Sequence, residues 1–502
     1  MLLLRIDRRG KTPLASQIFT QIQTLIQNDS LKTGAALPST RELAQKLGVN
    51  RSTVCEAYQE LWAHGYTESR PGSYTRVRKR PKSSTRSDTN RNGLIDWERK
   101  ATKPSRFLLK DYEETLPGNG IHSLKGLINL DRFDLDYRLF PLETFRKCLN
   151  KVLDEKRAHL LQYGSVQGYR RLREFVAERS QIHGIAIGPE QIMITNGAQQ
   201  ALDLIFRLLT IPGETVAAES PTYVNFIPLM RYYRVRALEI PIKSDGLDLA
   251  HLKRALKKTQ PAFLYTMPNF QNPTGISTSQ DHREKLLSIC EMHQIPIVED
   301  GFEEEMKYFG KVALPIKSMD ENKIVIYTGT FSKVLFPGIR VGWIAAEEEC
   351  IKRLRAIKRF ADLSPNNAVQ AAVYEFCAQG HYDLHIRRMH RIFRKRMQAA
   401  LTALDRHVPK ENIKWTVPSG GYLIWVELAV PPTNGKFFRE ILRKHRLYVA
   451  PVNNFFYRKG SSLCFRISIS MLNEEEIETA ISALGRAIRE FNHRLQEGRV
   501  IS

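Results

Sequence analysis

The sequence lacks clustered cysteines and long apolar runs, and each absence excludes a class of protein. Its 502 residues include six cysteines that lie far apart and form no C-x-x-C pair, so neither a disulfide framework nor a zinc site is indicated. No run approaches the ~18 apolar residues that a membrane-spanning helix needs. The opening Met-Leu-Leu-Leu is followed at once by Arg5, which leaves too short an apolar stretch for a signal peptide. We therefore expect a protein of the reducing cytoplasm without a membrane segment.

Acidic residues are scarce relative to basic ones. Lys and Arg number 76 against 53 Asp and Glu, which gives a formal net charge of +23. Residues 1–82 contain 14 Lys and Arg but only 6 Asp and Glu, so about a sixth of the chain carries a third of the excess. Such a charge balance favours a polyanionic partner, and the first segment is the place to look for its binding surface.

Residues 1–78 predict three helices followed by a hairpin. Apolar residues at spacings of three and four indicate a first helix that begins after Pro13. Ser39, with Glu42 three residues later, has the spacing of a capping box and predicts the start of a second helix, and a third helix follows. Two short strands around a turn at 70–73 complete the segment. This order is typical of a winged helix-turn-helix domain.

Residues 79–120 and 121–502 differ sharply in character. The first range is rich in Ser, Thr, Asn and Arg and poor in apolar residues, which is typical of a flexible linker. In the second range, helical segments alternate with short apolar runs such as Ile324–Tyr327. Buried strands that alternate with helices predict a largely parallel α/β sheet, and two later strands between 421 and 470 predict a smaller C-terminal α+β part.

Four elements of this α/β domain place reactive groups beside predicted strands. Lys333 follows a buried strand, where desolvation would lower its pKa enough for imine formation. Asp300 also ends a strand and could hold a pyridine nitrogen protonated. The helix that begins within 195–199 offers backbone N–H groups to a phosphate, and Arg340 can add charge-assisted hydrogen bonds. Asn272 lies in a turn from which it could reach a phenolic oxygen. Together the four elements predict a site for pyridoxal 5'-phosphate.

The same motifs give the chain a resemblance to a known family. Residues 124–485 look like a fold-type I aminotransferase, while residues 10–78 resemble the GntR-type winged helix through LPSTRELA at 37–44 and NRSTV at 50–54. Joined in this order, the two parts resemble the MocR subfamily of GntR regulators. The resemblance implies an N-terminal winged helix-turn-helix and an α/β pyridoxal phosphate-dependent transferase domain of fold type I with a small C-terminal α+β domain.

The resemblance also implies a cofactor site in which Lys333 binds pyridoxal phosphate covalently. The other residues implied around the cofactor are Asp300 at the ring nitrogen, Asn272 at the phenolic oxygen, Tyr223 against the ring, and Ala198, Gln199, Thr330, Ser332 and Arg340 at the phosphate. Tyr163 would reach the phosphate from a neighbouring subunit, since the family usually builds this site across a homodimer. Arg466 would bind the α-carboxylate of a ligand. Phe302 stands where the family commonly has a tyrosine, so one hydrogen bond to the cofactor should be missing.

In the winged helix, the third helix should enter the major groove of double-stranded DNA while the wing contacts the backbone or the minor groove. Arg51, near the start of this helix, is the expected reader of base edges. The other residues implied at the DNA by similarity are Arg41, Asn50, Ser52, Thr53 and, at the wing tip, Gly72.

We interpret the chain as a pyridoxal phosphate-dependent transcriptional regulator, a homodimer that senses an amino acid, an amine or the cofactor itself. This interpretation predicts that a ligand bound at Lys333 changes DNA binding. An alternative is an active aminotransferase of an α-amino acid, whose turnover would not need residues 1–78. A third hypothesis, a nucleic-acid binder whose large domain only dimerises, predicts that Lys333→Ala changes neither DNA binding nor any ligand response.

Overall fold

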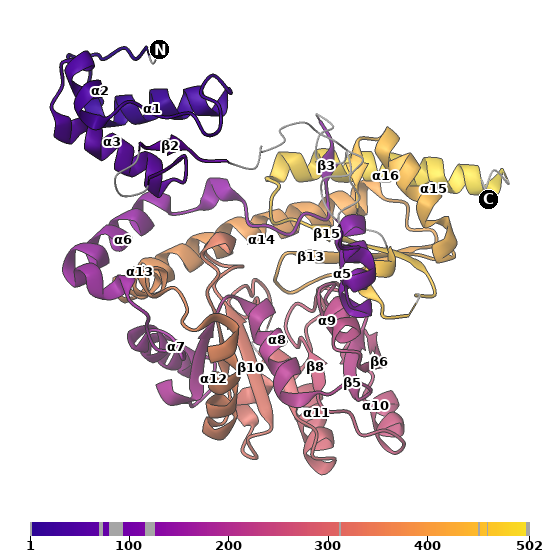
Figure 1. Cartoon of the computed structure of the whole chain (residues 1–502). Coiled ribbons are helices and arrows are strands. Elements are labelled where there is room, and N and C mark those ends of the chain that lie inside the picture. The colour runs from indigo at the N-terminus through magenta and orange to yellow at the C-terminus, as the bar shows by residue number, and fades with distance from the viewer. Residues whose placement is uncertain are drawn as a thin grey trace. The chain divides into compact units, whose positions relative to one another are not determined.

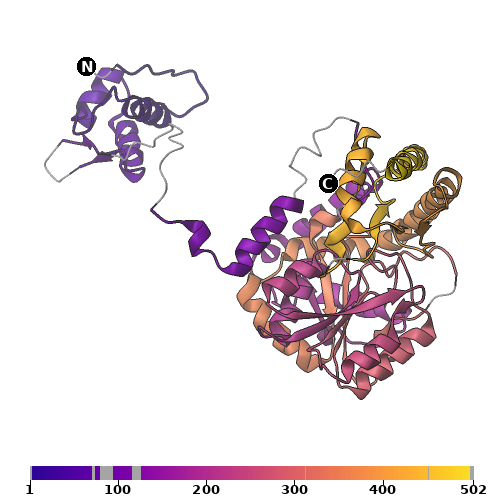
Figure 2. The same cartoon turned by 90° about the vertical axis from the view of Figure 1, so that its right-hand side faces the viewer.

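The chain divides into two units, Met1–Asp96 and Trp97–Ser502, drawn in Figures 1 and 2. The computed structural model describes residues 3–69, 74–79, 94–115, 126–310, 313–449, 452–458 and 460–497. Within these ranges, no helix combines the length and the apolarity needed to cross a bilayer.

The described residues of the first unit contain the predicted three helices and two strands. These are α1 (Leu14–Gln27), α2 (Thr40–Leu47), α3 (Arg51–Ala63), and the antiparallel pair β1 (Thr67–Glu68) and β2 (Arg76–Val77). The Ser39 hydroxyl accepts a hydrogen bond from the backbone N–H of Glu42 at 3.1 Å, as expected for the start of α2. Ile22, Leu43 and Val54 belong to one buried apolar cluster that joins the helices. The winged helix prediction is thus confirmed.

Part of the segment expected as a flexible linker is helical. It contains α4 (Trp97–Lys100) and α5 (Lys103–Thr115), both within the second unit. Helix α5 lies against α9 (Phe226–Tyr232), and the guanidinium carbon of Arg231 lies 4.9 Å from the centroid of the Phe107 ring. The prediction of a flexible linker therefore needs correction over residues 97–115, because the contacts of α5 come from residues more than a hundred positions away.

The described residues of the second unit form an eight-stranded sheet in the order β4-β11-β10-β9-β8-β5-β6-β7. The strands are β4 (Ile192–Thr195), β5 (Thr215–Ser220), β6 (Arg236–Lys243), β7 (Gly246–Leu247), β8 (Leu264–Thr266), β9 (Ile297–Asp300), β10 (Val325–Thr330) and β11 (Gly342–Ala345). Strands β10, β9, β8, β5 and β6 run parallel, while β11 is antiparallel to both neighbours and β7 is antiparallel to β6. The prediction of a largely parallel sheet is confirmed.

Helices cover both faces of this sheet (Figure 2). Val216 and Ala218 of β5 pack in one cluster with residues of α8 (Ala198–Leu209), α9 and α12 (Glu348–Asp362). Ala217, between them, packs in another cluster with residues of α10 (Leu249–Leu256) and α11 (Gln280–Met292). Successive strand residues point to opposite faces, so burial on both sides explains why the inner strands read as continuous apolar runs.

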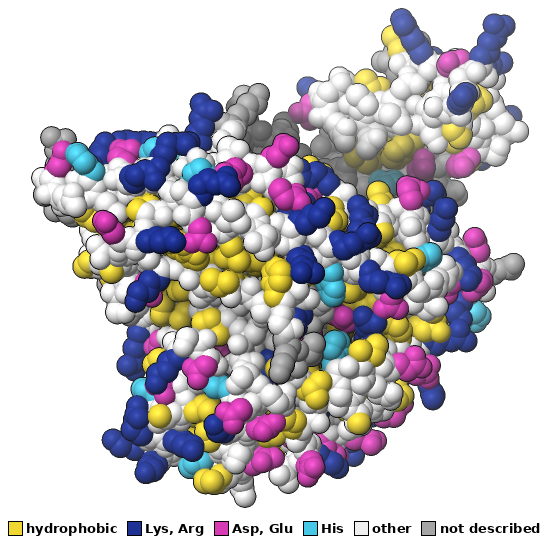
Figure 3. Space-filling view, turned by 180° about the vertical axis from the view of Figure 1, so that it is seen from behind, with side chains coloured by type: hydrophobic (Ala, Val, Ile, Leu, Met, Phe, Trp, Pro, Cys, Tyr) yellow, Lys and Arg dark blue, Asp and Glu magenta, His cyan; other side chains and the backbone are white. Residues whose placement is uncertain are grey.

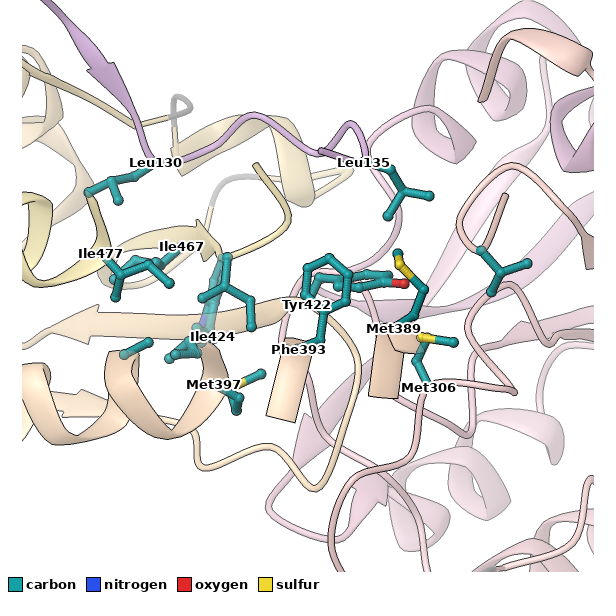
Figure 4. Packing of buried hydrophobic residues seen from close by; sticks show 14 of the residues in the cluster. Leu130, Leu135, Met306, Met389, Phe393, Met397, Tyr422, Ile424, Ile467 and Ile477 are labelled. Carbon is teal, nitrogen blue, oxygen red and sulfur yellow. The ribbon is translucent and has the colours of Figure 1, made fainter. Parts of the chain in front are cut away.

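A smaller antiparallel sheet, in the order β12-β13-β15, lies in the C-terminal part. Its strands and the surrounding elements are β12 (Ile413–Trp415), β13 (Leu423–Leu428), β15 (Leu463–Ser468), α14 (His381–His407), α15 (Gly435–Lys444), α16 (Glu474–Gln496), and the parallel pair β3 (Ile128–Asn129) and β14 (Leu447–Tyr448). Helices α6 (Leu142–Lys156), α7 (Arg170–Ile182) and α13 (Asn367–Ala378) complete the described helices of the unit. Figure 4 shows Phe393 of α14 against Tyr422, in a cluster that also contains Ile194 of the large sheet. This shared core fixes β15 relative to the large sheet.

Candidate functional site

Lys333 lies just beyond the carboxyl end of β10. Its Nζ donates a hydrogen bond to the carbonyl oxygen of Phe133 at 2.6 Å and lies 3.9 Å from the centroid of the Phe133 ring. Burial lowers the pKa of Lys333 to about 8, against the opposing effect of the carboxylate of Glu303. A lysine of this kind has a larger unprotonated fraction at neutral pH, and the unprotonated amine is the form that attacks a carbonyl carbon.

Asp300 ends β9, the neighbour of β10 in the sheet. Its side chain is buried, and Oδ2 accepts a hydrogen bond from the Tyr265 hydroxyl at 2.8 Å. The second oxygen, Oδ1, is buried without a hydrogen-bond partner among the described residues. Burial also raises the pKa of Asp300 to about 6. A buried carboxylate oxygen without a donor is costly, so the arrangement fits a bound ring whose protonated nitrogen would supply one.

The start of α8 forms an anion-binding corner with Arg340. Gly197 has φ of +82° and turns the chain from β4 into the helix, which begins at Ala198 and Gln199. The Nη2 of Arg340 donates to the carbonyl oxygen of Asn196 at 2.9 Å, and a Cβ on Gly197 would lie 2.5 Å from this nitrogen. The missing side chain of Gly197 therefore lets a guanidinium approach a helix N-terminus, a combination that suits a phosphate group.

Thr330 and Ser332 lie on the other side of Arg340. The Thr330 hydroxyl accepts a hydrogen bond from the backbone N–H of Ser332 at 3.1 Å, and the Ser332 hydroxyl accepts one from Nη1 of Arg340 at 3.4 Å. The structure thus brings Thr330, Ser332 and Arg340 together near the start of α8. The corner combines a cation with the positive end of a helix dipole and therefore favours an anion such as a phosphate group.

Arg466 extends from β15 of the small sheet toward the loop that follows β8. Its Nη1 donates to Oδ1 of Asn272 at 2.9 Å, and its Nη2 lies 2.7 Å from Oδ1 of Asp131. Tyr223 is held near the phosphate corner, because its hydroxyl donates to Oε1 of Gln199 at 3.3 Å. Arg466, Asn272 and Tyr223 therefore come from three separate parts of the sequence, and the first two are in direct contact.

Tyr163 is not brought to the other site residues within one chain. Its side chain is 85% exposed, and it lines a surface hollow with Ser364, Pro365 and Asn366. Its expected role in a neighbouring subunit stays a prediction.

Sequence reasoning missed Asp131, Phe133 and Glu303. Glu303 is buried, and neither of its carboxylate oxygens has a hydrogen-bond partner among the described residues. Burial raises the pKa of Glu303 well above its ordinary value, and the nearby charge of Lys333 opposes the rise. The run of three glutamates directly after a buried strand was an available signal, since buried carboxylates mark functional sites. No pattern in the sequence pointed to Asp131 or Phe133.

The residues expected at DNA lie at the amino ends of α2 and α3. Arg41 is exposed in the first turn of α2, and Arg51 is exposed as the first residue of α3. The Nε of Arg51 donates to the Thr40 hydroxyl at 3.4 Å, so the two helix starts are adjacent. The remaining described residues of the set are Asn50 and Ser52, which are exposed, and Thr53, which is half-buried. Gly72 lies outside the described residues.

One face of the large unit carries charges of both signs. On the face seen in Figure 3, its Lys and Arg side chains are interspersed with Asp and Glu. Such a surface gives a weaker attraction for a polyanion than a face of one charge sign.

Two family models match the chain. Aminotransferase class I and II matches residues 126–484, and the GntR family of bacterial regulatory proteins matches residues 14–77. The HTH-type transcriptional regulator YdfD of Bacillus subtilis is 31% identical over 490 residues, which cover 96% of this chain and 98% of YdfD. The regulatory protein MocR of Rhizobium meliloti is 29% identical over 409 residues, covering 81% of this chain and 80% of MocR.

A solved structure resembles the large unit. LysN, the α-aminoadipate aminotransferase of Thermus thermophilus in complex with N-(5'-phosphopyridoxyl)-L-leucine, has 32% sequence identity and a TM-score of 0.71, covering 80% of this chain and 100% of LysN. Homologues with this aminotransferase fold depend on pyridoxal phosphate. The chain therefore belongs to the aminotransferase class I and II family and, through the GntR domain that precedes this fold, to the MocR-like transcriptional regulators.

Proposed function

We propose that this regulator binds pyridoxal phosphate at Lys333, works as a homodimer in the cytoplasm, and changes its affinity for double-stranded DNA when an amino acid or amine binds. The observation that carries the proposal is the pairing of two groups at adjacent strand ends. Lys333 has a lowered pKa at the end of β10, and Asp300 has a buried unpartnered oxygen at the end of β9. Pyridoxal phosphate would offer a carbonyl carbon to the amine of Lys333 and a protonated ring nitrogen to the carboxylate of Asp300.

The residues of the chain divide the work of holding this cofactor. When bound, pyridoxal phosphate supplies an aldehyde and an electron-withdrawing ring. Lys333 would provide the amine, and Asp300 would hold a proton at the ring nitrogen. Arg340 and the first N–H groups of α8 would bind the phosphate, while Asn272 would contact the phenolic oxygen. Phe302 is buried with its ring edge-on to Phe133 and offers no hydroxyl to the cofactor.

The proposal requires a route from the ligand site to the segment that precedes the large unit, and α5 lies on such a route. The guanidinium of Arg231 lies between the rings of Phe107 and Tyr457 and donates to the carbonyl oxygen of Tyr457 at 3.1 Å. Phe455 precedes Tyr457 by two residues, and its ring centroid lies 5.2 Å from the guanidinium carbon of Arg466. A ligand at Lys333 would displace the ring of Phe133, which lies 5.2 Å from the same guanidinium carbon. This change in packing around Arg466 can move the loop that supports α5, provided that the ligand has different affinity for the two arrangements.

Phe107→Ala should weaken this coupling. The substitution removes the ring that stacks on Arg231 but touches no residue of the ligand site, so ligand affinity should stay within about twofold. A ligand typically changes affinity at a coupled site about 5- to 150-fold. In the variant, the coupling free energy that corresponds to this change in DNA affinity should be less than half of the wild-type value. Fluorescence anisotropy of a labelled operator duplex, with and without ligand, measures the change, and Leu109→Ala on an exposed position of the same helix is the matched control.

One experiment separates this function from its alternatives. The affinity of the full chain for a DNA duplex from upstream of its own gene is measured in the presence of each member of a panel of amino acids and amines. The wild type and Lys333→Ala are compared. The proposal predicts a ligand response in the wild type that the variant lacks. Equal behaviour of the two proteins would favour a large unit that only dimerises. Steady turnover of amino acid and 2-oxo acid pairs without any DNA response would favour an aminotransferase.

A further inference from the structure

A short segment of the chain, residues 131–133, contacts both Lys333 and Arg466, the two side chains that a ligand would engage. The carbonyl oxygen of Phe133 accepts a hydrogen bond from Lys333 Nζ at 2.6 Å, and the ring of Phe133 lies beneath this nitrogen. The guanidinium carbon of Arg466 lies 5.2 Å from the centroid of the same ring. The ring of Phe133 is therefore in contact with both the predicted covalent anchor and the predicted carboxylate-binding arginine.

Asp131, two residues earlier, neutralises Arg466. Its Oδ1 lies 2.7 Å from Nη2 of Arg466 and accepts a hydrogen bond from Nε at 3.0 Å, while its backbone carbonyl accepts one from Nη2 at 3.1 Å. With Nη1 bound to Asn272, every nitrogen of the guanidinium is engaged by the protein. The exposed fraction of the Arg466 side chain is only 6%. A ligand carboxylate can make a bidentate contact with Nε and Nη2 of this arginine only by displacing Asp131.

That displacement is unfavourable for two reasons. Removing one partner of a buried hydrogen-bonded ion pair leaves the other charge unpaired, which costs a large part of the gain from a new contact. The charges around Lys333 are also balanced as they stand, because Glu303 and Asp134 act on its charge in one direction and Arg466 and Arg340 in the other. A ligand carboxylate on Arg466 would leave the carboxylate of Asp131 unpaired beside it, and the two like charges would repel each other, whereas an amine brings no such charge.

We propose that Asp131 determines ligand specificity by occupying Arg466, so that the site selects amines over the α-amino acids that carry the same side chain. An amine can approach Lys333 while the pair between Asp131 and Arg466 stays intact. An amino acid must break the pair and add a like charge beside it. This inference rests on the proposed function, because it assumes that the ligand is recognised at Lys333.

The test uses the full chain loaded with pyridoxal phosphate and two matched pairs of ligands. These are 3-methylbutylamine with L-leucine, and 2-phenylethylamine with L-phenylalanine. Binding is followed by the change in visible absorption and, independently, by titration calorimetry. The wild type should bind each amine at least tenfold more tightly than its amino acid. Asp131→Asn should raise amino acid affinity at least tenfold and leave amine affinity within threefold, which removes most of the preference.

Asp405→Asn is the matched control, because it removes the same charge from an exposed position of α14, where Asp405 pairs with Lys410, and it should leave the preference within twofold. Equal affinity of the wild type for both members of each pair would overturn the inference, even if Asp131→Asn failed to fold. A preference that Asp131→Asn leaves unchanged would also overturn it. A wild type without the visible absorption of bound cofactor would instead overturn the proposed function, and the inference with it.

Discussion

Lys333→Ala should abolish the visible absorption of bound pyridoxal phosphate. Without the amine, the cofactor would be held by Asp300 and the phosphate corner alone, so its affinity should fall by roughly 100-fold or more, equal to about 2.8 kcal/mol at 1.4 kcal/mol per decade. Binding of DNA in the absence of ligand should remain, because the winged helix folds around a separate apolar cluster. Absorption spectra and cofactor titrations measure the first effect, and anisotropy with labelled DNA measures the second.

Lys352→Ala is the control for this experiment, since it removes an exposed lysine of α12 whose ion pair with Glu349 is also exposed. It should leave the spectrum and the cofactor affinity unchanged. A Lys333→Ala protein that still shows the wild-type visible spectrum would contradict the assignment of this lysine.

Gly197→Ala should weaken cofactor binding at least tenfold. A Cβ at this position would lie 2.5 Å from Nη2 of Arg340, and the φ of +82° is a conformation that side chains rarely adopt. The guanidinium would have to leave the start of α8, which separates the two components of the phosphate corner. The left-handed backbone should also lower the free energy of unfolding by roughly 1–2 kcal/mol.

Gly213→Ala separates these two effects. Gly213 has φ of +96°, and a Cβ at this position would have no atom within 4 Å. It precedes the amino end of β5, whereas the candidate site lies at the carboxyl ends of the strands. Gly213→Ala should lower the free energy of unfolding by about as much as Gly197→Ala does. It should leave cofactor affinity unchanged. Equal cofactor affinities of the two variants would contradict the proposed phosphate corner.

Local signals made the first unit predictable from the sequence. The hydroxyl of Ser39 and the amide of Asn50 cap α2 and α3 as their spacing suggested, since a cap depends on residues two or three positions away. The inner strands of the large sheet were also predictable, because burial on both faces leaves a continuous apolar run. Strand β6 was missed because polar residues interrupt its pattern in the sequence RALEIPIK.

Lys333 and Asp300 could be proposed from the sequence because their residue types and their places after buried strands suggest the chemistry, and the structure places them at the ends of neighbouring strands. The positions of Asp131 and Phe133 were not, because their contacts join residues that are 335 and 200 positions apart in the sequence. Helix α5 was missed for the same reason, since it packs against α9, where Phe107 contacts Arg231, a residue more than a hundred positions away.

The central claim is that Lys333 is the residue that binds the aldehyde of pyridoxal phosphate. Borohydride reduction of the cofactor-saturated full chain, followed by peptide mass mapping, tests it directly. The account predicts one labelled peptide that contains Lys333 and carries the mass of the reduced cofactor. Label on another lysine, with Lys333 unmodified, would contradict it.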